Sequence, residues 1–301
     1  MTTKLLSPTS DIVFKMLFGD ERNTDILAAF LKAVLLLPED EFREVTILNP
    51  FLGSEYPDEK ATILDVKATT ASGRRIDIEI QVQNHSAMRE RILYYTARMF
   101  TEQVESGDDY SVICPVVCIL ITDFRMIENT VYHNKYRLHD PRTGSEFSDL
   151  LEVNVLELPK MPGAATMDDA ALLDWLKFLK AKNLEELEML AQGNPDVQKA
   201  VRRLVELSAD DKARMLAEAR EKARRDKEAY AKDAREEGLT EGRAEGRAEG
   251  RAEGRAEGLA EGEKLKAIQI AKNLLQTGIS VELIAQATGL TRQEIAALHA
   301  H

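Results

Sequence analysis

The sequence has few cysteines and few aromatic residues, and it lacks both a signal-like segment and an apolar run of membrane length. Cys114 and Cys118 have neither CxxC spacing nor a nearby histidine pair, which argues against a disulfide framework and a structural zinc site. The N-terminal segment MTTKLLSPTSD has no apolar stretch of the kind that signal peptides need. The longest apolar run, residues 26–37, contains Lys32 and is shorter than the ~20 residues of a bilayer span. These absences predict a soluble cytoplasmic protein without a membrane partner.

Basic residues are outnumbered, with 40 Lys and Arg against 52 Asp and Glu in 301 residues, a net charge of −12. Bulk attraction to DNA comes from Lys and Arg that neutralise phosphates, so an acidic chain does not gain it. Any contact with nucleic acid must therefore use a local surface. The 44% of apolar residues are enough for a sizeable core, and the length predicts one or two domains.

Four regions of different character follow one another along the chain. Residues 1–165 mix strand and helix patterns, and residues 166–237 have the apolar periodicity and composition of helices. Residues 238–263 hold a four-residue repeat of Gly, Glu, Arg and Ala, and residues 264–301 are typical of a small helical module. We predict these four ranges as a mixed α/β domain, a helical extension, a tether or self-associating helix, and a terminal module.

The first region predicts a mixed α/β domain, because its helical segments alternate with β-branched, alternating runs. Helices are expected at 11–18, 26–37 and 86–107. Strands are expected at 43–50, 62–69, 75–83, 111–124, 130–138 and 151–159. Three amphipathic helices follow at 167–182, 184–192 and 196–208. Trp175 in the first of these is expected to pack in a core.

The repeat EGRA, from Glu241 to Gly258, is unfavourable as a lone helix. Each interior Gly costs roughly 1 kcal/mol relative to Ala, and the i,i+4 neighbours are Glu with Glu and Arg with Arg, which repel. Two interpretations stay open: a flexible tether, or a self-associating helix whose Gly and Ala stripes allow close approach. We expect a homo-oligomer formed through the C-terminal helical region.

The terminal module resembles a helix-turn-helix, with the capping box TRQE at 291–294. A DNA-reading helix should offer several Arg, Lys, Asn or Gln side chains to the bases. This one offers Arg292 and Gln293 before an Ala-rich end, which favours a packing or oligomerisation module over a DNA reader.

The segment ILDVKATTASGRRIDIEIQVQ, residues 63–83, predicts a β-hairpin that gathers acidic side chains. A turn centred near Ser72 places residues whose numbers sum to 144 opposite each other. Asp65 then faces Glu79, and Lys67 faces Asp77. Opposed side chains have Cβ atoms ~4.5–5.5 Å apart, at which distance two carboxylates repel.

A divalent cation would offset this repulsion, because Mg²⁺ binds carboxylate oxygens at ~2.0–2.1 Å and keeps its remaining waters. The alternative is a solvated hairpin face, with the two acids screened by Lys67, Arg74 and Arg75. A register slip of one residue would also remove the pairing.

The hairpin and its neighbours resemble the PD-(D/E)XK nuclease superfamily, and more closely its recombination-promoting nuclease family of transposase-like proteins. The resemblance rests on SPTSDIVFKMLFG, ILDVKA, IDIEIQVQ, RERILYYTARMFTEQVESGDDY and the apolar strand ending in ITDF, in matching order and spacing over the first ~125 residues. The tail AKNLLQTGISVELIAQATGLTRQEIAAL is similar to C-termini of that family. The resemblance implies a restriction-endonuclease-like α/β core, a central mixed sheet flanked by helices, with an all-helical C-terminal extension.

The resemblance also implies roles for individual residues. Asp65 and Glu79 match the metal-binding acids, and the main-chain carbonyl of Ile80 would be a further metal ligand. Gln81 stands where the superfamily usually has the catalytic lysine, and its amide cannot take a proton at neutral pH. Asp11 matches an acidic residue of the first helix with a supporting role; the alternative is a helix N-terminal residue favoured by the macrodipole.

Lys67 projects from the same strand face as Asp65 and is a candidate to replace the missing cation, by orienting water or by stabilising charge on the phosphate. An ion pair with Asp77 is the alternative. Three residues of the following helix, Arg91, Tyr94 and Tyr95, are candidates to contact the phosphate backbone. Otherwise Arg91 is a surface cation and Tyr95 packs in the core.

The function that the resemblance implies is a metal-dependent DNA endonuclease, with Mg²⁺ as the cofactor and Mn²⁺ or Ca²⁺ as alternatives. It would hydrolyse phosphodiester bonds in recombination, mobile elements or phage defence. The alternative is a catalytically inactive family member that acts as a nucleic-acid-binding or protein-interaction module.

Overall fold

The computed structural model describes residues 5–48, 66–84, 86–163 and 169–298. The chain forms two compact units, Met1–Arg224 and Arg225–His301, and each contains its own hydrophobic core. No helix among the described residues combines the length and the apolar character needed to span a membrane.

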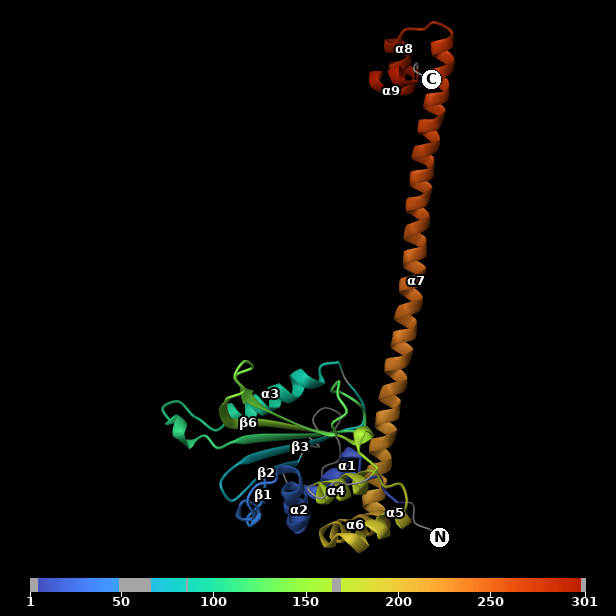
Figure 1. Cartoon of the computed structure of the whole chain (residues 1–301). Coiled ribbons are helices and arrows are strands. Elements are labelled where there is room, and N and C mark those ends of the chain that lie inside the picture. Colours follow the sequence, from blue (N-terminus) through green and yellow to red (C-terminus); the bar gives the residue numbers. More distant parts are fainter. Residues whose placement is uncertain (1–4, 49–65, 85, 164–168, 299–301) are drawn as a thin grey trace. The chain divides into compact units, whose positions relative to one another are not determined.

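The first unit is built on a mixed six-stranded sheet of strand order β1-β2-β3-β4-β6-β5 (Figure 1). Its strands are β1 Thr46–Ile47, β2 Val66–Thr69, β3 Arg75–Gln81, β4 Val116–Thr122, β5 His133–His139 and β6 Glu146–Glu157. The central strands β3, β4 and β6 are parallel, while β1, β2 and β5 pair antiparallel with their neighbours. The predicted mixed sheet is thus confirmed.

Helices cover both faces of this sheet. They are α1 Asp11–Phe18, α2 Thr24–Leu35, α3 Met88–Thr101, α4 Ala170–Lys180, α5 Leu184–Gly193 and α6 Pro195–Ala209. Helix α3 connects the parallel strands β3 and β4 and lies on one face, while α1, α2 and α4 lie on the other (Figure 1). Helix α3 ends earlier than predicted, at Thr101 rather than near residue 107.

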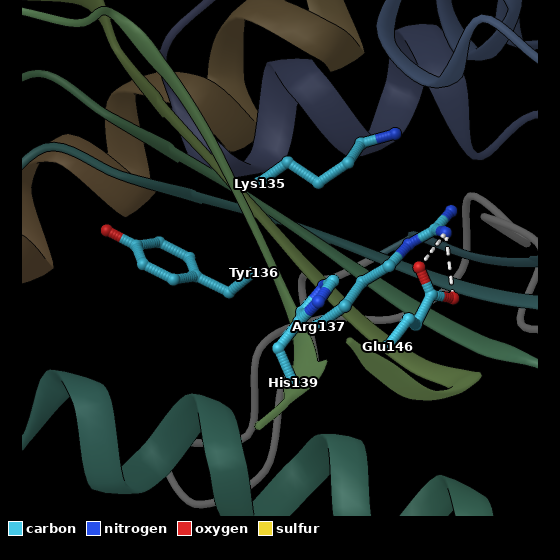
Figure 2. A pocket seen from close by; sticks show the side chains of 5 residues that line it. All are labelled: Lys135, Tyr136, Arg137, His139 and Glu146. Carbon is cyan, nitrogen blue, oxygen red and sulfur yellow. Dashed lines mark hydrogen bonds and ion pairs between the residues drawn. The ribbon is translucent and has the colours of Figure 1, made fainter. Parts of the chain in front are cut away.

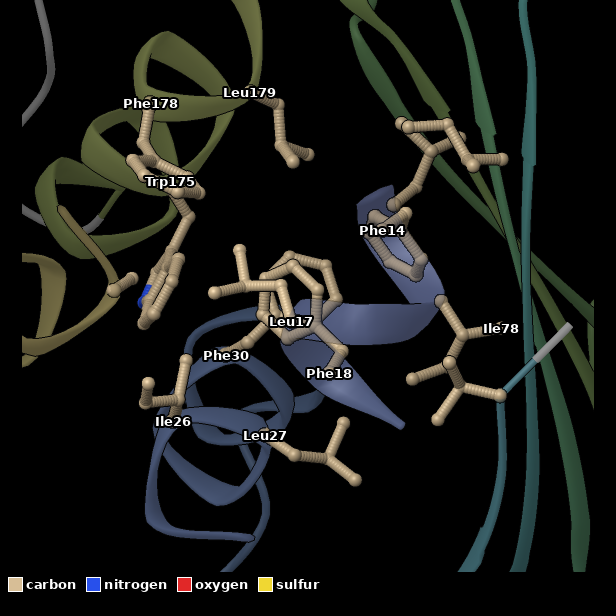
Figure 3. Packing of buried hydrophobic residues seen from close by; sticks show 14 of the residues in the cluster. Phe14, Leu17, Phe18, Ile26, Leu27, Phe30, Ile78, Trp175, Phe178 and Leu179 are labelled. Atoms are coloured by element: carbon tan, nitrogen blue, oxygen red, sulfur yellow. The ribbon is translucent and has the colours of Figure 1, made fainter. Parts of the chain in front are cut away.

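The main core fills the face of the sheet that α1, α2, α4 and α6 cover. Phe18 and Phe30 meet Trp175 there, with the Trp175 ring 5.9 Å from Phe18 and 5.7 Å from Phe30 between centroids, and Phe14 packs on Phe18 (Figure 3). The predicted core role of Trp175 is confirmed, since this residue is fully buried. Helices of the predicted extension, residues 166–237, therefore share a core with the predicted first domain, residues 1–165. The boundaries of the four predicted domains stay a prediction.

Strand β3 divides its side chains between the two faces as its alternation predicts. Ile76, Ile78 and Ile80 belong to the main core. The opposite face is covered by α3, whose Met88 and Ile92 form a second core with Cys118 and Leu120 of β4 and Val155 of β6. Asp77 and Glu79 pair with Cys118 and Leu120 across the ladder, so they point toward this α3 side.

The β2–β3 turn confirms the predicted hairpin register. Val66 pairs with Ile78 and Lys67 with Asp77, so the residue numbers of each pair sum to 144. Gly73 closes the turn at φ +83°, and a Cβ at this position would lie 2.9 Å from Cys114 Sγ. Glycine suits both the backbone angle and the close approach.

The four-residue repeat lies within one long helix, α7 Asp211–Gln276, so its backbone is helical rather than irregular. Self-association of this helix stays a prediction. In the second unit, α8 Val281–Thr288 and α9 Arg292–Ala297 pack on the end of α7 through Ala271, Ile284 and Ile295. The predicted capping box is present, because Thr291 and Glu294 cap each other at the start of α9.

Candidate active site

Glu79 is a buried carboxylate on the α3 side of β3, with a side chain 9% exposed. Arg91 Nη2, from the first turns of α3, donates a hydrogen bond to Glu79 Oε1 at 2.6 Å. The helical period explains this contact. Met88 and Ile92 face the second core, so Arg91 lies at the edge of the helix face that covers the sheet. A charge-assisted bond of this length is among the stronger polar contacts in a protein.

Arg91 also faces an aromatic pair on α3. Its guanidinium carbon lies 5.6 Å from the centre of the Tyr95 ring, within the range of a cation–π contact. The Tyr94 and Tyr95 rings meet edge to face, with centroids 5.5 Å apart. Both tyrosines are exposed, which differs from the interpretation of Tyr95 as a core residue.

The other described candidates of the hairpin lie on the same sheet face as Glu79. Lys67 is half-buried directly opposite the buried Asp77. Gln81 is half-buried at the end of β3, where its main-chain oxygen accepts a hydrogen bond from Asp123 N at 3.0 Å. The strand period places the Gln81 side chain on the same face as Glu79. An amide there can orient a water but cannot act as a base at neutral pH.

Asp65 lies outside the described residues, so its predicted pairing with Glu79 stays a prediction. Among the described residues, no group of three His, Cys, Asp or Glu side chains is close enough to hold a metal ion. The donors that are present are nevertheless hard oxygen ligands: the Glu79 carboxylate, the Asp77 carboxylate two residues earlier, and the Ile80 carbonyl. This chemistry fits Mg²⁺, which needs only one or two carboxylates and retains water.

Asp11 contacts α7. Its Oδ2 accepts hydrogen bonds from Arg220 Nε at 2.9 Å and Nη2 at 2.6 Å, and its Oδ1 accepts from Ile12 N. The bonds from Arg220 attach the first helix to the start of α7. Asp11 is also the first residue of α1, as the helix N-terminal interpretation requires. The supporting catalytic role of Asp11 stays a prediction.

Lys15 is a buried charge that sequence reasoning did not single out. It is 4% exposed on α1, and lysines are almost never buried to this extent unless they are paired. A Cβ at position 19 would lie 3.2 Å from Lys15 Cγ and 3.5 Å from Val66 Cγ2, so Gly19 leaves room for the lysine stem beside the first residue of β2. The available signal was a single lysine in a helix whose residues after Asp11 are otherwise all apolar.

A second buried carboxylate, Glu152 on β6, lies on the opposite face of the sheet. It accepts hydrogen bonds from Arg137 Nε at 2.6 Å and Asn154 Nδ2 at 2.8 Å, and Lys135 Nζ lies 3.2 Å away. Arg137 also contacts Glu146 at 3.3 Å (Figure 2). Strand β4 lies between β3 and this cluster of β6 and β5.

The acid–base properties of this cluster are shifted by its surroundings. Burial acts to raise the pKa of Glu152, but hydrogen bonds from Asn154 and Arg137 outweigh it and hold that pKa below its ordinary value. Burial lowers the pKa of His133, which lies 2.9 Å from Asn154 Oδ1. The cluster is therefore a satisfied network that favours an ionised Glu152 and a neutral His133.

The comparisons with known proteins agree with this geometry. The profile of the PD-(D/E)XK nuclease family transposases matches residues 8–234, well over half of the chain. The chain belongs to the PD-(D/E)XK nuclease family transposases. The profile of the Rpn/YhgA-like nuclease family C-terminal HTH domain matches residues 264–300. No curated protein and no solved structure matched the chain.

Membership in the PD-(D/E)XK nuclease family transposases agrees with the restriction-endonuclease-like fold seen in the first unit. The matched region continues past α6 into α7, so it includes the helices that share the main core. The second match confirms the predicted helix-turn-helix shape of α8 and α9. The family assignment thus supports a nuclease-type function for the unit that carries Glu79.

Proposed function

We propose that the protein is a divalent-metal-dependent DNA endonuclease that hydrolyses phosphodiester bonds, with Mg²⁺ as the resident ion. Its biological setting would be recombination, mobile elements or phage defence. The observation that carries the proposal is Glu79, a buried carboxylate on the second strand of a hairpin whose register follows the nuclease motif. The family assignment supports the same reaction class.

In the proposed site, Glu79, the Ile80 carbonyl and Asp65 would hold the ion. When bound, the ion would polarise a phosphate oxygen and activate water. The described register, continued by one pair from Val66 and Ile78, supports the predicted placement of position 65 opposite Glu79. Two carboxylates at that spacing are the minimum set for this chemistry.

The remaining polar side chains would bind and orient the substrate. Gln81 would position water through its amide, because it cannot take the proton itself. Lys67, which pairs with Asp77 across the hairpin, would supply positive charge on the same face. On α3, Arg91, Tyr94 and Tyr95 would contact the phosphate backbone.

The residues of α8 and α9 alone favoured a packing module, but the matched C-terminal domain is of the helix-turn-helix type, and we therefore propose DNA as the partner of the second unit as well. Arg292 and Gln293 are exposed at the start of α9, where a recognition helix meets the bases. Arg292 also forms an ion pair with Glu282 at 3.8 Å, in which both side chains are exposed. A small set of such contacts gives weak binding, so the module would assist the nuclease unit.

The test is plasmid nicking by the full chain with Mg²⁺, Mn²⁺, Ca²⁺ or EDTA. The proposal predicts cleavage that requires the metal and is lost in Asp65→Ala but retained in Glu102→Gln, which changes an exposed acid at the end of α3. Cleavage that survives Asp65→Ala would refute the site. Absence of metal-dependent cleavage of DNA or RNA would favour the non-catalytic, binding alternative.

We also propose that the chain forms a homo-oligomer through α7. Successive residues turn about 100° around a helix, so Glu and Arg of the repeat form stripes about 200° apart with Gly or Ala between them. Like charges follow each other at i,i+4 within each stripe and destabilise the lone helix. Nothing lies within 4 Å of a Cβ placed at Gly242, Gly246, Gly250 or Gly254, so this face is open.

Charge complementarity selects a second copy of α7 in parallel as the occupant. In a parallel dimer the two copies are related by a twofold axis that runs along the helices, and their Gly residues meet at the contact line. On both sides of that line the Glu stripe of one copy then lies beside the Arg stripe of the other. An antiparallel pair would set Glu against Glu. The period of four exceeds 3.6, which favours a right-handed wrap, as in helix pairs that meet at small residues.

A further inference from the structure

The contact between Arg91 and Glu79 uses a carboxylate that the proposed metal also needs. Glu79 is 9% exposed whereas Arg91 is 43% exposed, so the acid is fixed in the fold and the base lies at its rim. Nη2 of Arg91 lies 2.6 Å from Oε1 of Glu79. Mg²⁺ binds carboxylate oxygens at ~2.0–2.1 Å, so a bound ion and Arg91 would contact the same group.

A guanidinium at that distance opposes a cation bound to the same carboxylate. If the ion takes Oε1, it displaces the hydrogen bond of Arg91. If it takes Oε2, Arg91 remains within a few ångströms of a doubly positive ion and repels it, with little screening because the acid is buried. Both arrangements lower the affinity of the site for metal while Arg91 stays on Glu79.

Arg91 has a second contact that does not depend on Glu79. The Tyr95 ring lies 5.6 Å from its guanidinium carbon, and Tyr94 adjoins that ring. Stacking there would hold the side chain at the surface, where a phosphate of nucleic acid offers two oxygens to the planar fork of arginine. Arriving nucleic acid would thus remove the competitor from Glu79.

We propose, on the basis of the proposed metal site, that Arg91 and the divalent ion compete for Glu79 and that a nucleic-acid phosphate relieves this competition. Arg91 is then a positioning residue that couples metal binding to substrate binding. The site holds metal weakly when it is empty of nucleic acid and more tightly once a phosphate engages Arg91. Linkage requires the reciprocal effect, so metal tightens nucleic-acid binding by the same factor.

The experiment measures the Kd of Mn²⁺ by electron paramagnetic resonance of the free ion, using the full chain without nucleic acid. We expect Arg91→Gln to bind Mn²⁺ about tenfold more tightly than wild type, within the roughly 5- to 150-fold typical of coupled sites. Arg91→Lys keeps the positive charge and should stay close to wild type. Arg98→Gln is the matched control, because Arg98 lies on the same helix and pairs with Glu102 instead. It should leave the Kd unchanged.

A second arm adds a short DNA duplex with nuclease-resistant linkages. Wild type should then bind Mn²⁺ more tightly, and Arg91→Gln should show little further gain. If wild type binds Mn²⁺ and Arg91→Gln binds it equally or less tightly, the competition is refuted while the nuclease proposal stands. If neither protein binds Mn²⁺ in either arm, the metal site itself is refuted. Thermal unfolding of each variant checks that the fold is retained.

Discussion

Two buried glutamates on one sheet share the same chemistry in different settings. Glu79 and Glu152 each accept a bond of 2.6 Å from an arginine. Around Glu152, Lys135 and Asn154 add contacts, and Arg137 is held by Glu146 and is 25% exposed. Arg91 is 43% exposed and contacts a tyrosine ring on its other side.

The difference teaches how to distinguish a structural ion pair from one that exchanges partners. An arginine that contacts two acids and is largely covered cannot turn out into solvent. Removing its buried carboxylate partner therefore leaves a charge without compensation and destabilises the fold. An arginine at the rim with an aromatic neighbour can leave its acid without losing hydration. We therefore expect Glu152 to serve stability and Glu79 to serve chemistry.

The largest expected effect is on catalysis, in Glu79→Gln. The amide keeps the shape of the side chain but removes the charge that would hold the ion. The nicking rate should fall by about 10² or more, as when a key electrostatic group is removed from an active site. Stability should change little, because Arg91 is exposed to solvent. Nicking at wild-type rate by this variant would contradict the comparison.

The next effect is on stability, in Glu152→Gln. The variant leaves Arg137 and Lys135 facing an uncharged partner. The free energy of unfolding should fall by about 2 kcal/mol, below the full cost of breaking a buried pair because both bases are partly exposed. Urea unfolding measures this change, with Asp149→Gln on the same strand as an exposed control. Glu152→Gln should still nick plasmid DNA. A Glu152→Gln protein that is as stable as wild type but inactive would mean that Glu152, rather than Glu79, serves catalysis.

Self-association should respond to the charges of the repeat. In one chain Arg243, Arg247, Arg251 and Arg255 are changed to Glu, and in another Glu245, Glu249, Glu253 and Glu257 are changed to Arg. Sedimentation should show wild type as an oligomer and each altered chain alone as a weaker one, because each altered chain then sets like charges against each other. The mixture of the two altered chains should form a hetero-oligomer, because it restores opposite charges across the pair. A monomeric wild type, or altered chains that associate equally well alone, would refute the pairing.

The smallest effect is a pH dependence of stability near His133. Burial lowers its pKa in the folded chain, so the unfolded chain takes up the proton at higher pH. The stabilisation is complete above the ordinary pKa of 6.5 and is lost as pH falls through 6.5 toward the folded pKa. The Tm of His133→Asn should therefore depend less on pH over this window than that of wild type. Equal slopes of Tm against pH in wild type and His133→Asn would contradict this contribution of His133.

Local patterns predicted the hairpin and its register well. Ile76 and Ile78 alternate with Asp77 and Glu79, and a period of two determines which residues share a face. The turn at Gly73 then determines which residues lie opposite. Such features depend on neighbours within a few residues, which a single sequence displays.

Contacts between distant segments were not predictable in the same way. The bond from Arg220 to Asp11 spans more than two hundred positions, and the partner of Arg91 depends on how α3 returns across β3. The buried Lys15 also depends on the approach of β2 to α1. Helix propensity could not decide whether the repeat of α7 is a flexible tether or a helix. Its glycines and its like-charged i,i+4 neighbours both oppose a lone helix.

The most direct test of the central claim is a crystal of the full chain soaked in Mn²⁺ and measured for anomalous scattering. The proposal predicts one strong peak in direct contact with a carboxylate oxygen of Glu79, with Asp65 as a second ligand and Arg91 turned away toward Tyr95. A saturating soak that leaves Glu79 bonded to Arg91, with no peak beside it, would contradict the metal-dependent nuclease.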